Sequence, residues 1–126
     1  MAQGIAELAY LGDAVFELMV REKLLNENTP IKLISKKSRN LVSAPAQSEM
    51  YHRIFDMLTD DEKNIIKRGR NLHTNSRSKN ADVVEYRHAT GLEALFGWLH
   101  LNKNQDRLLE LFQLCTDKGD SKDEKR

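Results

Sequence analysis

The chain has 126 residues, the length of one small domain, which leaves little room for a second independent core. Hydrophobic residues make up 40% and charged residues 31% of the chain, a balance that is typical of a globular protein. No apolar stretch reaches the length of a membrane span, no basic-then-apolar leader follows Met1, and the single Cys115 excludes an internal disulfide. These features predict a cytoplasmic protein that does not bind membranes.

Helical spacing of apolar residues dominates the first half of the sequence. It predicts a long first helix from about Gly4 to Leu25. Thr29 is the expected N-cap of a second, shorter helix from Pro30 to about Asn40, with proline at its first position. A third helix is predicted to begin at Ser43, with Pro45 in its first turn.

The second half contains three more predicted helices. Thr59 to Glu62 reads Thr-Asp-Asp-Glu, a capping box that marks the start of the fourth helix. His73 to Asn80 is rich in Asn and Ser and predicts a loop. Two further helices are predicted from about Asp82 to Asn102 and from about Gln105 to Asp117, and residues 119–126 are too charged to pack. With no strand signal, the pattern predicts an all-α fold.

Basic residues are concentrated in two windows, although the formal net charge is only +1. No acid occurs from Ile31 to Ser48, where Lys37 and Arg39 lie, or from Lys67 to Asn80. Two such windows are compatible with a phosphate-binding surface, but a solvated helix face is the commoner cause of a charge run. Both interpretations remain open from the charges alone.

Two acids occur where their helices are otherwise apolar. On a helical wheel, Asp13 and Glu93 both have mostly apolar or small neighbours. A carboxylate in such surroundings loses hydration and needs a cation or hydrogen-bond donors. The structural interpretation is a salt bridge to Arg21 or Arg87, or a helix edge that faces water.

Small residues accompany both acids and favour a functional interpretation. Gly12 precedes Asp13, and Gly97 lies one turn after Glu93. Small side chains let two helices cross closely, and a crossing here would let both carboxylates share a hard divalent cation such as Mg²⁺. A cation held in this way can activate water against a phosphodiester.

Four blocks of sequence carry a family resemblance. LAYLGDAVFEL spans Leu8 to Leu18, and TGLEALFGWL spans Thr90 to Leu99. KKSRNLVSA spans Lys36 to Ala44, and KRGRN, from Lys67 to Asn71, is followed by NADVVEYRHAT, from Asn80 to Thr90. Together the blocks resemble the ribonuclease III family, and in particular its short-form branch, Mini-ribonuclease III. The resemblance covers nearly the whole chain.

The resemblance implies a catalytic domain over residues 1–118 with the helical bundle of ribonuclease III, assembled as a homodimer. Asp13 and Glu93 would be the catalytic residues and the ligands of Mg²⁺, which Mn²⁺ can replace, and a water on that ion would be the nucleophile. Each of the two sites would cut one strand of double-stranded RNA by hydrolysis. The implied substrate is the precursor of the large-subunit (23S) ribosomal RNA, and a ribosomal protein that presents it is a further implied partner.

The resemblance also implies which residues bind RNA and which form the dimer. The chain has no room for a separate RNA-binding domain, so the catalytic domain would grip the duplex itself. Tyr10 and Phe16 are the interface candidates, because the first helix is apolar on more than one face, with a place in the core as the alternative. The candidate RNA contacts are Lys67, Arg68, Arg70, Asn71, Arg77, Lys79, Lys37 and Arg39.

Departures from the full-length enzymes leave the ligand number open. Those enzymes carry further acids four and seven residues before the signature aspartate, and three before the glutamate. The corresponding residues here are Ala9, Ala6 and Thr90. The short-form branch is similar in this respect. Two alternatives to a nuclease remain: a catalytically inactive binder of duplex RNA, and a helical protein-interaction module.

Overall fold

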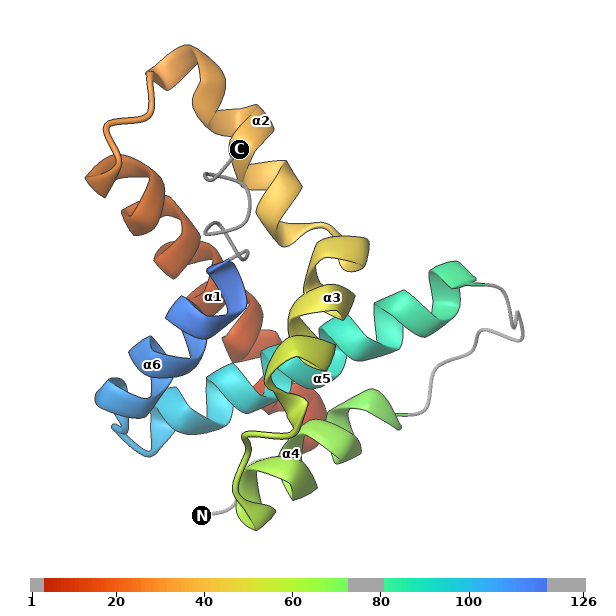
Figure 1. The fold of residues 1–126 in the computed structure, drawn as a ribbon. Helices are drawn as coiled ribbons and strands as arrows, with labels where there is room; N and C mark the ends of the chain where they lie inside the picture. Colours follow the sequence, from red (N-terminus) through yellow and green to blue (C-terminus); the bar gives the residue numbers. More distant parts are fainter. Residues whose placement is uncertain (1–3, 73–80, 118–126) are drawn as a thin grey trace.

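The computed structural model describes residues 4–72 and 81–117, and this part of the chain consists of helices without strands (Figure 1). The all-α prediction is therefore confirmed. The predicted loop at 73–80 and the charged tail at 119–126 lie outside the described residues. No helix in the described ranges is long and apolar enough to cross a membrane. The helices are α1 (Ile5–Asn26), α2 (Ile31–Val42), α3 (Ala44–Phe55), α4 (Asp60–Arg70), α5 (Ala81–Leu101) and α6 (Gln105–Thr116).

Two of the three predicted N-terminal caps, those at Ser43 and Thr59, are confirmed. The Ser43 hydroxyl accepts a hydrogen bond from the Ala46 amide (3.3 Å) at the start of α3. At the start of α4, the Glu62 amide donates to Thr59 Oγ1 (3.1 Å) and the Thr59 amide donates to Glu62 Oε1 (2.9 Å), which completes the capping box.

The predicted N-cap of the second helix is wrong. Pro30, not Thr29, occupies the N-cap of α2, and no side chain caps this helix. The Thr29 amide instead donates to the Leu24 carbonyl (3.0 Å), so Thr29 belongs to the turn that closes α1. Asn28, with a φ of 61°, makes that turn by entering the left-handed region, which asparagine tolerates better than most residues.

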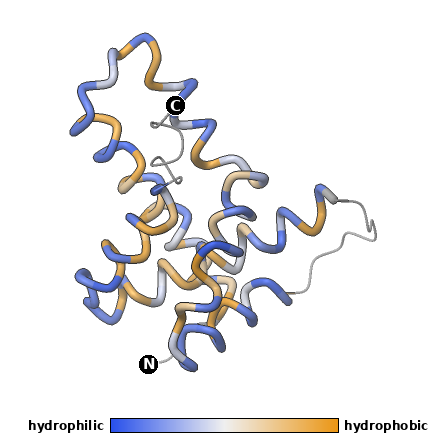
Figure 2. The backbone as a smooth tube through the Cα atoms, in the orientation of Figure 1, coloured by the Kyte–Doolittle hydropathy of each residue, from blue (hydrophilic) through white to orange (hydrophobic). Residues whose placement is uncertain are grey.

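Helix α5 passes through the middle of the molecule, and α1, α3 and α4 pack most closely against it (Figure 1). Apolar residues line the sides of the helices that face this centre (Figure 2). Phe16 of α1 lies in the core with only 1% of its surface exposed, in edge-to-face contact with Phe96 (5.5 Å between ring centroids) and Phe112 (5.8 Å). Phe16 is therefore a core residue of its own chain and offers no surface to a second copy.

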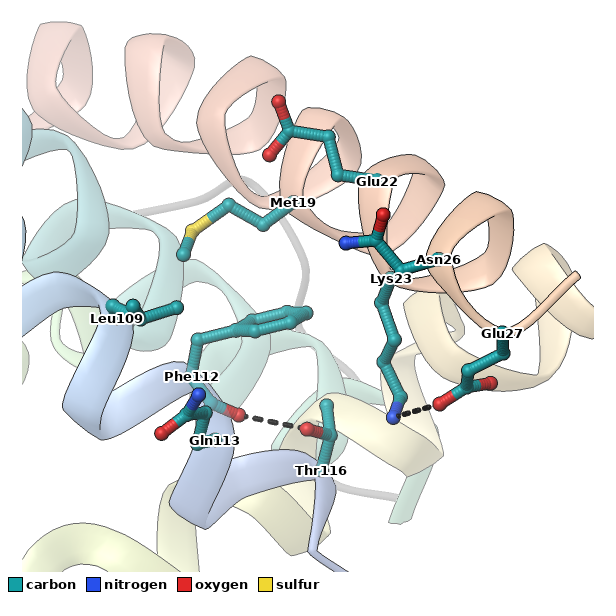
Figure 3. A pocket seen from close by; sticks show the side chains of 9 residues that line it. All are labelled: Met19, Glu22, Lys23, Asn26, Glu27, Leu109, Phe112, Gln113 and Thr116. Atoms are coloured by element: carbon teal, nitrogen blue, oxygen red, sulfur yellow. Dashed lines mark hydrogen bonds and ion pairs between the residues drawn. The ribbon is translucent and has the colours of Figure 1, made fainter.

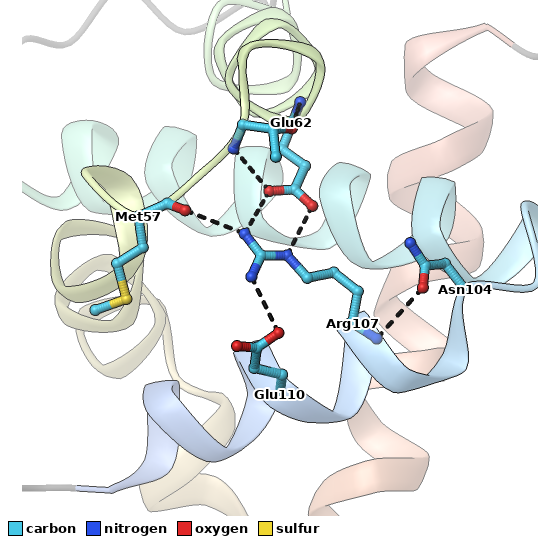
Figure 4. Close-up of polar contacts among 6 residues, drawn as sticks. Met57, Glu62, Asn104, Arg107 and Glu110 are labelled. Carbon is cyan, nitrogen blue, oxygen red and sulfur yellow. Dashed lines mark hydrogen bonds and ion pairs between the residues drawn. The ribbon is translucent and has the colours of Figure 1, made fainter.

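A buried ion pair ties the start of α4 to α6 (Figure 4). Arg107 donates from Nη2 and Nε to the two carboxylate oxygens of Glu62 (2.7 and 2.8 Å), and also to the Met57 carbonyl (3.1 Å). The hydrogen bonds from Arg107 hold the pKa of Glu62 below its usual value, although burial opposes them. The same carboxylate caps α4, so the Glu62 side chain both stabilises the start of α4 and holds α6 against it.

Helices α1 and α5 cross at two glycines. A Cβ atom on Gly12 would lie 1.6 Å from the backbone oxygen of Glu93, and one on Gly97 would lie 2.1 Å from the backbone oxygen of Leu8. Real Cβ atoms are never found so close to backbone, so no larger residue fits without moving the helices apart. The predicted close crossing at the acids is confirmed.

Replacing Gly12 with alanine should separate α1 from α5. We expect Gly12→Ala to lower the free energy of unfolding by about 3 kcal/mol, measured by urea denaturation, because overpacking forces backbone to shift. Gly4→Ala is the matched control, since its Cβ would meet only the movable Glu7 side chain, and should cost about 1 kcal/mol or less. Equal losses in the two variants would contradict the crossing.

Candidate active site

The helix crossing brings the two predicted acids to one place. Gly12, the residue before Asp13, lies against the backbone of Glu93, and the charge of Asp13 acts directly on the Glu93 carboxyl. Asp13 is exposed, whereas Glu93 is only partly exposed. The pair therefore lies at the molecular surface, with one carboxylate in water and the other at its edge.

The surroundings of Glu93 disfavour its charged form. Burial and, to a smaller extent, the negative charges of Asp13 and Glu17 raise the pKa of Glu93 to about 7. The opposing influence is a hydrogen bond from the side chain of Gln47 in α3, which lowers the pKa. Among the described residues, two acids thus repel the Glu93 carboxylate, and the neutral amide of Gln47 favours its charged form.

No basic side chain within 4–72 or 81–117 forms an ion pair with either Asp13 or Glu93. Arg21, one of the two expected partners, pairs with Glu17 instead (3.3 Å), and this contact is largely exposed. The salt-bridge interpretation of these acids is therefore wrong for the described residues. The other structural interpretation, a helix edge that faces water, fits Asp13, which is exposed.

The predicted basic residues that the structure describes lie on two helices, α2 and α4. Lys67 and Arg68 are exposed on α4, and Lys37 and Arg39 are exposed on α2. Arg39 lines the same hollow between α1 and α2 as Glu17. Arg77 and Lys79 lie outside the described residues.

Arg70 is the most constrained of the predicted RNA contacts. Its Nη1 donates to the Tyr51 hydroxyl (2.9 Å) and its Nε donates to the Asn71 side chain (3.1 Å). A Cβ on Gly91 would lie 3.4 Å from the Arg70 Cβ, so Arg70 packs against α5 at Gly91. Arg70 is therefore held against α3 and α5, where burial and, to a smaller extent, the Arg70 charge lower the pKa of His88.

A separate hollow lies between α1 and α6 (Figure 3). Met19, Leu109 and Phe112 form its apolar part, and an ion pair between Lys23 and Glu27 (2.6 Å) borders it. None of the predicted site residues lines this hollow. The acids lie instead on the open surface beside the crossing.

Comparison with known proteins assigns the family. The model of the Ribonuclease III domain matches residues 6–104. The chain belongs to the ribonuclease III family. It is 40% identical to the Mini-ribonuclease 3 of Enterococcus faecalis over 94% of this chain and 92% of that protein, and 42% identical to that of Thermoanaerobacter over 85% and 76%. A crystal structure of a Fusobacterium nucleatum protein matches with a TM-score of 0.77 at 35% identity, covering 88% of this chain and 89% of that one.

The donor set of this ribonuclease III domain suits a divalent cation that keeps much of its hydration. Within the described ranges, no group of three or more His, Cys, Asp or Glu side chains is arranged to hold a metal. Two carboxylates remain, Asp13 and Glu93, and Mg²⁺ is commonly held by one or two carboxylates plus waters and substrate phosphates. The unbalanced negative charge at the crossing fits the same ion.

Two residues near the site were missed from the sequence. Glu17 lies one helical turn after Asp13, and this spacing alone places both on one face of α1. Gln47 gave no signal, because a glutamine near the start of a helix is normally exposed. Only the tertiary packing of α3 against α5 buries it beside Glu93.

The raised pKa of Glu93 makes stability depend on pH. Protonation of Glu93 stabilises the fold fully below its unfolded-state pKa, and this contribution is lost as the pH rises through about 7. Without divalent cations, we expect the free energy of unfolding to fall between about pH 5 and pH 8, and to fall less in Glu93→Gln. Urea titrations in EDTA measure both profiles, and parallel profiles would contradict the shift.

Proposed function

We propose that this chain is a divalent-metal-dependent endoribonuclease that hydrolyses double-stranded RNA, with residues 1–118 as its catalytic domain. The observation that carries the proposal is the convergence of Asp13 and Glu93 at the α1–α5 crossing without a cationic partner among the described residues. Family membership and the names of the Mini-ribonuclease 3 relatives support the same reaction.

The two carboxylates have different tasks in this proposal. Asp13 is exposed and can approach the substrate side, whereas Glu93 is held at the edge of the core by Gln47. When bound, Mg²⁺ or Mn²⁺ supplies a Lewis acid that lowers the pKa of water and balances charge on the phosphodiester. The binding of a cation requires ionised Glu93, so it also releases the proton that the raised pKa favours.

The RNA duplex is proposed to lie across the basic residues of α2 and α4. Lys67, Arg68 and Arg70 are grouped in the last turn of α4, Asn71 follows directly, and Lys37 and Arg39 lie on α2. A-form RNA is recognised mostly through phosphates, 2′-hydroxyls and shape, which suits arginine and lysine side chains. Arg77 and Lys79, which follow Asn71 in the sequence, complete the proposed set.

The resemblance to Mini-ribonuclease III supports a specific substrate and setting. We propose precursor 23S ribosomal RNA as the substrate, the cytoplasm as the location, and a ribosomal protein as a partner that presents the RNA. These assignments come from the sequence resemblance. Cleavage of that precursor by the purified chain, with and without large-subunit ribosomal proteins, tests them, and equal rates on unrelated duplexes would oppose them.

Substitution of either acid should abolish cleavage. We expect Asp13→Asn and Glu93→Gln to slow the cleavage of a labelled RNA duplex in Mg²⁺ by more than about 100-fold, because several kcal/mol of charge stabilisation are lost. Glu22→Gln, which changes an exposed acid on the same helix, should cleave like the wild type. Binding of RNA without cleavage by the wild type would favour the inactive binder, and neither binding nor cleavage would favour the interaction module.

Removal of the proposed phosphate contacts should weaken RNA binding in a salt-dependent way. For Arg68→Gln and Arg70→Gln we expect weaker binding, with the slope of log affinity against log salt reduced by about 1 for each contact. Lys103→Gln is the matched control. Lys103 lies just after the C-terminal end of α5, whereas the proposed RNA contacts precede its N-terminal end in the sequence. Titrations of catalytically inactive Asp13→Asn protein give the slopes, and unchanged slopes would remove these residues from the interface.

We also propose that α1 forms a homodimer interface. Tyr10 is 84% exposed and Leu18 is 57% exposed, on a helix whose opposite side is already in the core. We expect Tyr10→Glu to convert a two-chain species to single chains in sedimentation equilibrium, because a carboxylate at a dimer contact loses hydration. Leu109→Glu on α6 should leave the mass unchanged, and a single-chain mass for the wild type would refute the dimer.

A further inference from the structure

Gln47 is a polar side chain buried inside the chain. It lies in the first turn of α3 with only 2% of its surface exposed. Its Nε2 donates to the Val42 carbonyl (3.1 Å), and its amide also forms the hydrogen bond with the Glu93 carboxyl. Its Oε1 is buried and has no hydrogen-bond partner among residues 4–72 and 81–117.

This arrangement is unfavourable for folding alone. A buried acceptor without a partner loses its hydration and gains nothing in return, whereas an apolar side chain of similar shape would avoid that loss. Methionine has nearly the length of glutamine and fills irregular core space well. Packing by itself therefore does not explain an amide at position 47.

The chemistry of the neighbouring acids does explain it. The Glu93 carboxylate faces repulsion from Asp13 and Glu17, and it needs a donor to hold it in one orientation. Lysine or arginine would hold it more strongly but would also neutralise the charge that a cation requires. A neutral amide orients the carboxylate and leaves its charge available.

We propose that Gln47 is a positioning residue, whose buried amide orients the Glu93 carboxylate toward Asp13 for the binding of a divalent cation. This inference rests on the proposed function, because it assigns Gln47 to the same acidic pair. Groups that orient metal ligands in this way commonly change metal affinity by about 10- to 100-fold when they are removed.

The test measures Mn²⁺ binding and folding separately. In isothermal titration of the full chain with Mn²⁺, we expect Gln47→Met to raise the dissociation constant on the order of 10-fold, while the urea midpoint of the metal-free protein stays at or near the wild-type value. Ser48→Ala is the matched control, because this neighbouring buried residue bonds to His88 (2.8 Å) and not to the acids. It should bind Mn²⁺ like the wild type.

A second variant covers the case in which Gln47→Met does not fold. Gln47→Asn keeps the amide but shortens the side chain by one methylene, so it withdraws the donor from Glu93, and we expect weaker Mn²⁺ binding here too. Wild-type affinity in a folded Gln47 variant would overturn the inference. A purely structural role would lower the urea midpoint and leave the affinity of the folded protein unchanged.

Comparison with Asp13→Asn separates this inference from the proposed function. If the wild type binds Mn²⁺, Asp13→Asn does not, and Gln47→Met matches the wild type, only the role of Gln47 is overturned. If the wild type does not bind Mn²⁺, or Asp13→Asn binds it equally well, the proposed metal site fails and the role of Gln47 fails with it.

Discussion

The contact between α1 and α5 at Gly12 and Gly97 is the constraint on which the site depends. Backbone lies against backbone there, with no space for even one methyl group. This distance fixes how far the side chains on either helix can be from each other. Asp13 and Glu93 are 80 residues apart in sequence (93 minus 13), and they meet only because nothing larger than hydrogen lies between their helices.

The same contact places the site in conflict with folding. Packing α1 against α5 brings acidic side chains together and partly buries one of them, which raises the pKa of Glu93. The rest of the molecule compensates through interactions that do not involve these acids. The aromatic contacts of Phe16 secure α1, and the Glu62–Arg107 pair secures α4 and α6. The stability contributed by these contacts therefore offsets the electrostatic repulsion among the acids.

Local signals in the sequence predicted local structure well. The capping box at Thr59 and the cap at Ser43 involve residues three positions apart, so their hydrogen bonds can be expected from spacing alone. The glycines beside Asp13 and Glu93 also predicted a close crossing, because small residues have few other reasons to gather on two apolar helices. These predictions needed no knowledge of the tertiary fold.

Tertiary choices could not be predicted in this way. Phe16 was equally compatible with a core and with an interface, and only its contacts with α5 and α6 decide between them. Thr29 has a side chain that could cap α2, but its amide donates a hydrogen bond to the Leu24 carbonyl at the end of α1. Gln47 is polar and became buried because α3 packs on α5, a fact that no spacing encodes.

The tethering of Arg70 has a thermodynamic consequence for any anion that reaches it. Arginine loses considerable rotational entropy when a ligand immobilises it, and this loss opposes binding. Here the guanidinium is already anchored to Tyr51, which is 3% exposed and stacked on His88 with 4.5 Å between ring centroids. Much of the ordering is thus completed when the chain folds, so a phosphate that bound there would meet a preorganised cation and a smaller entropic loss.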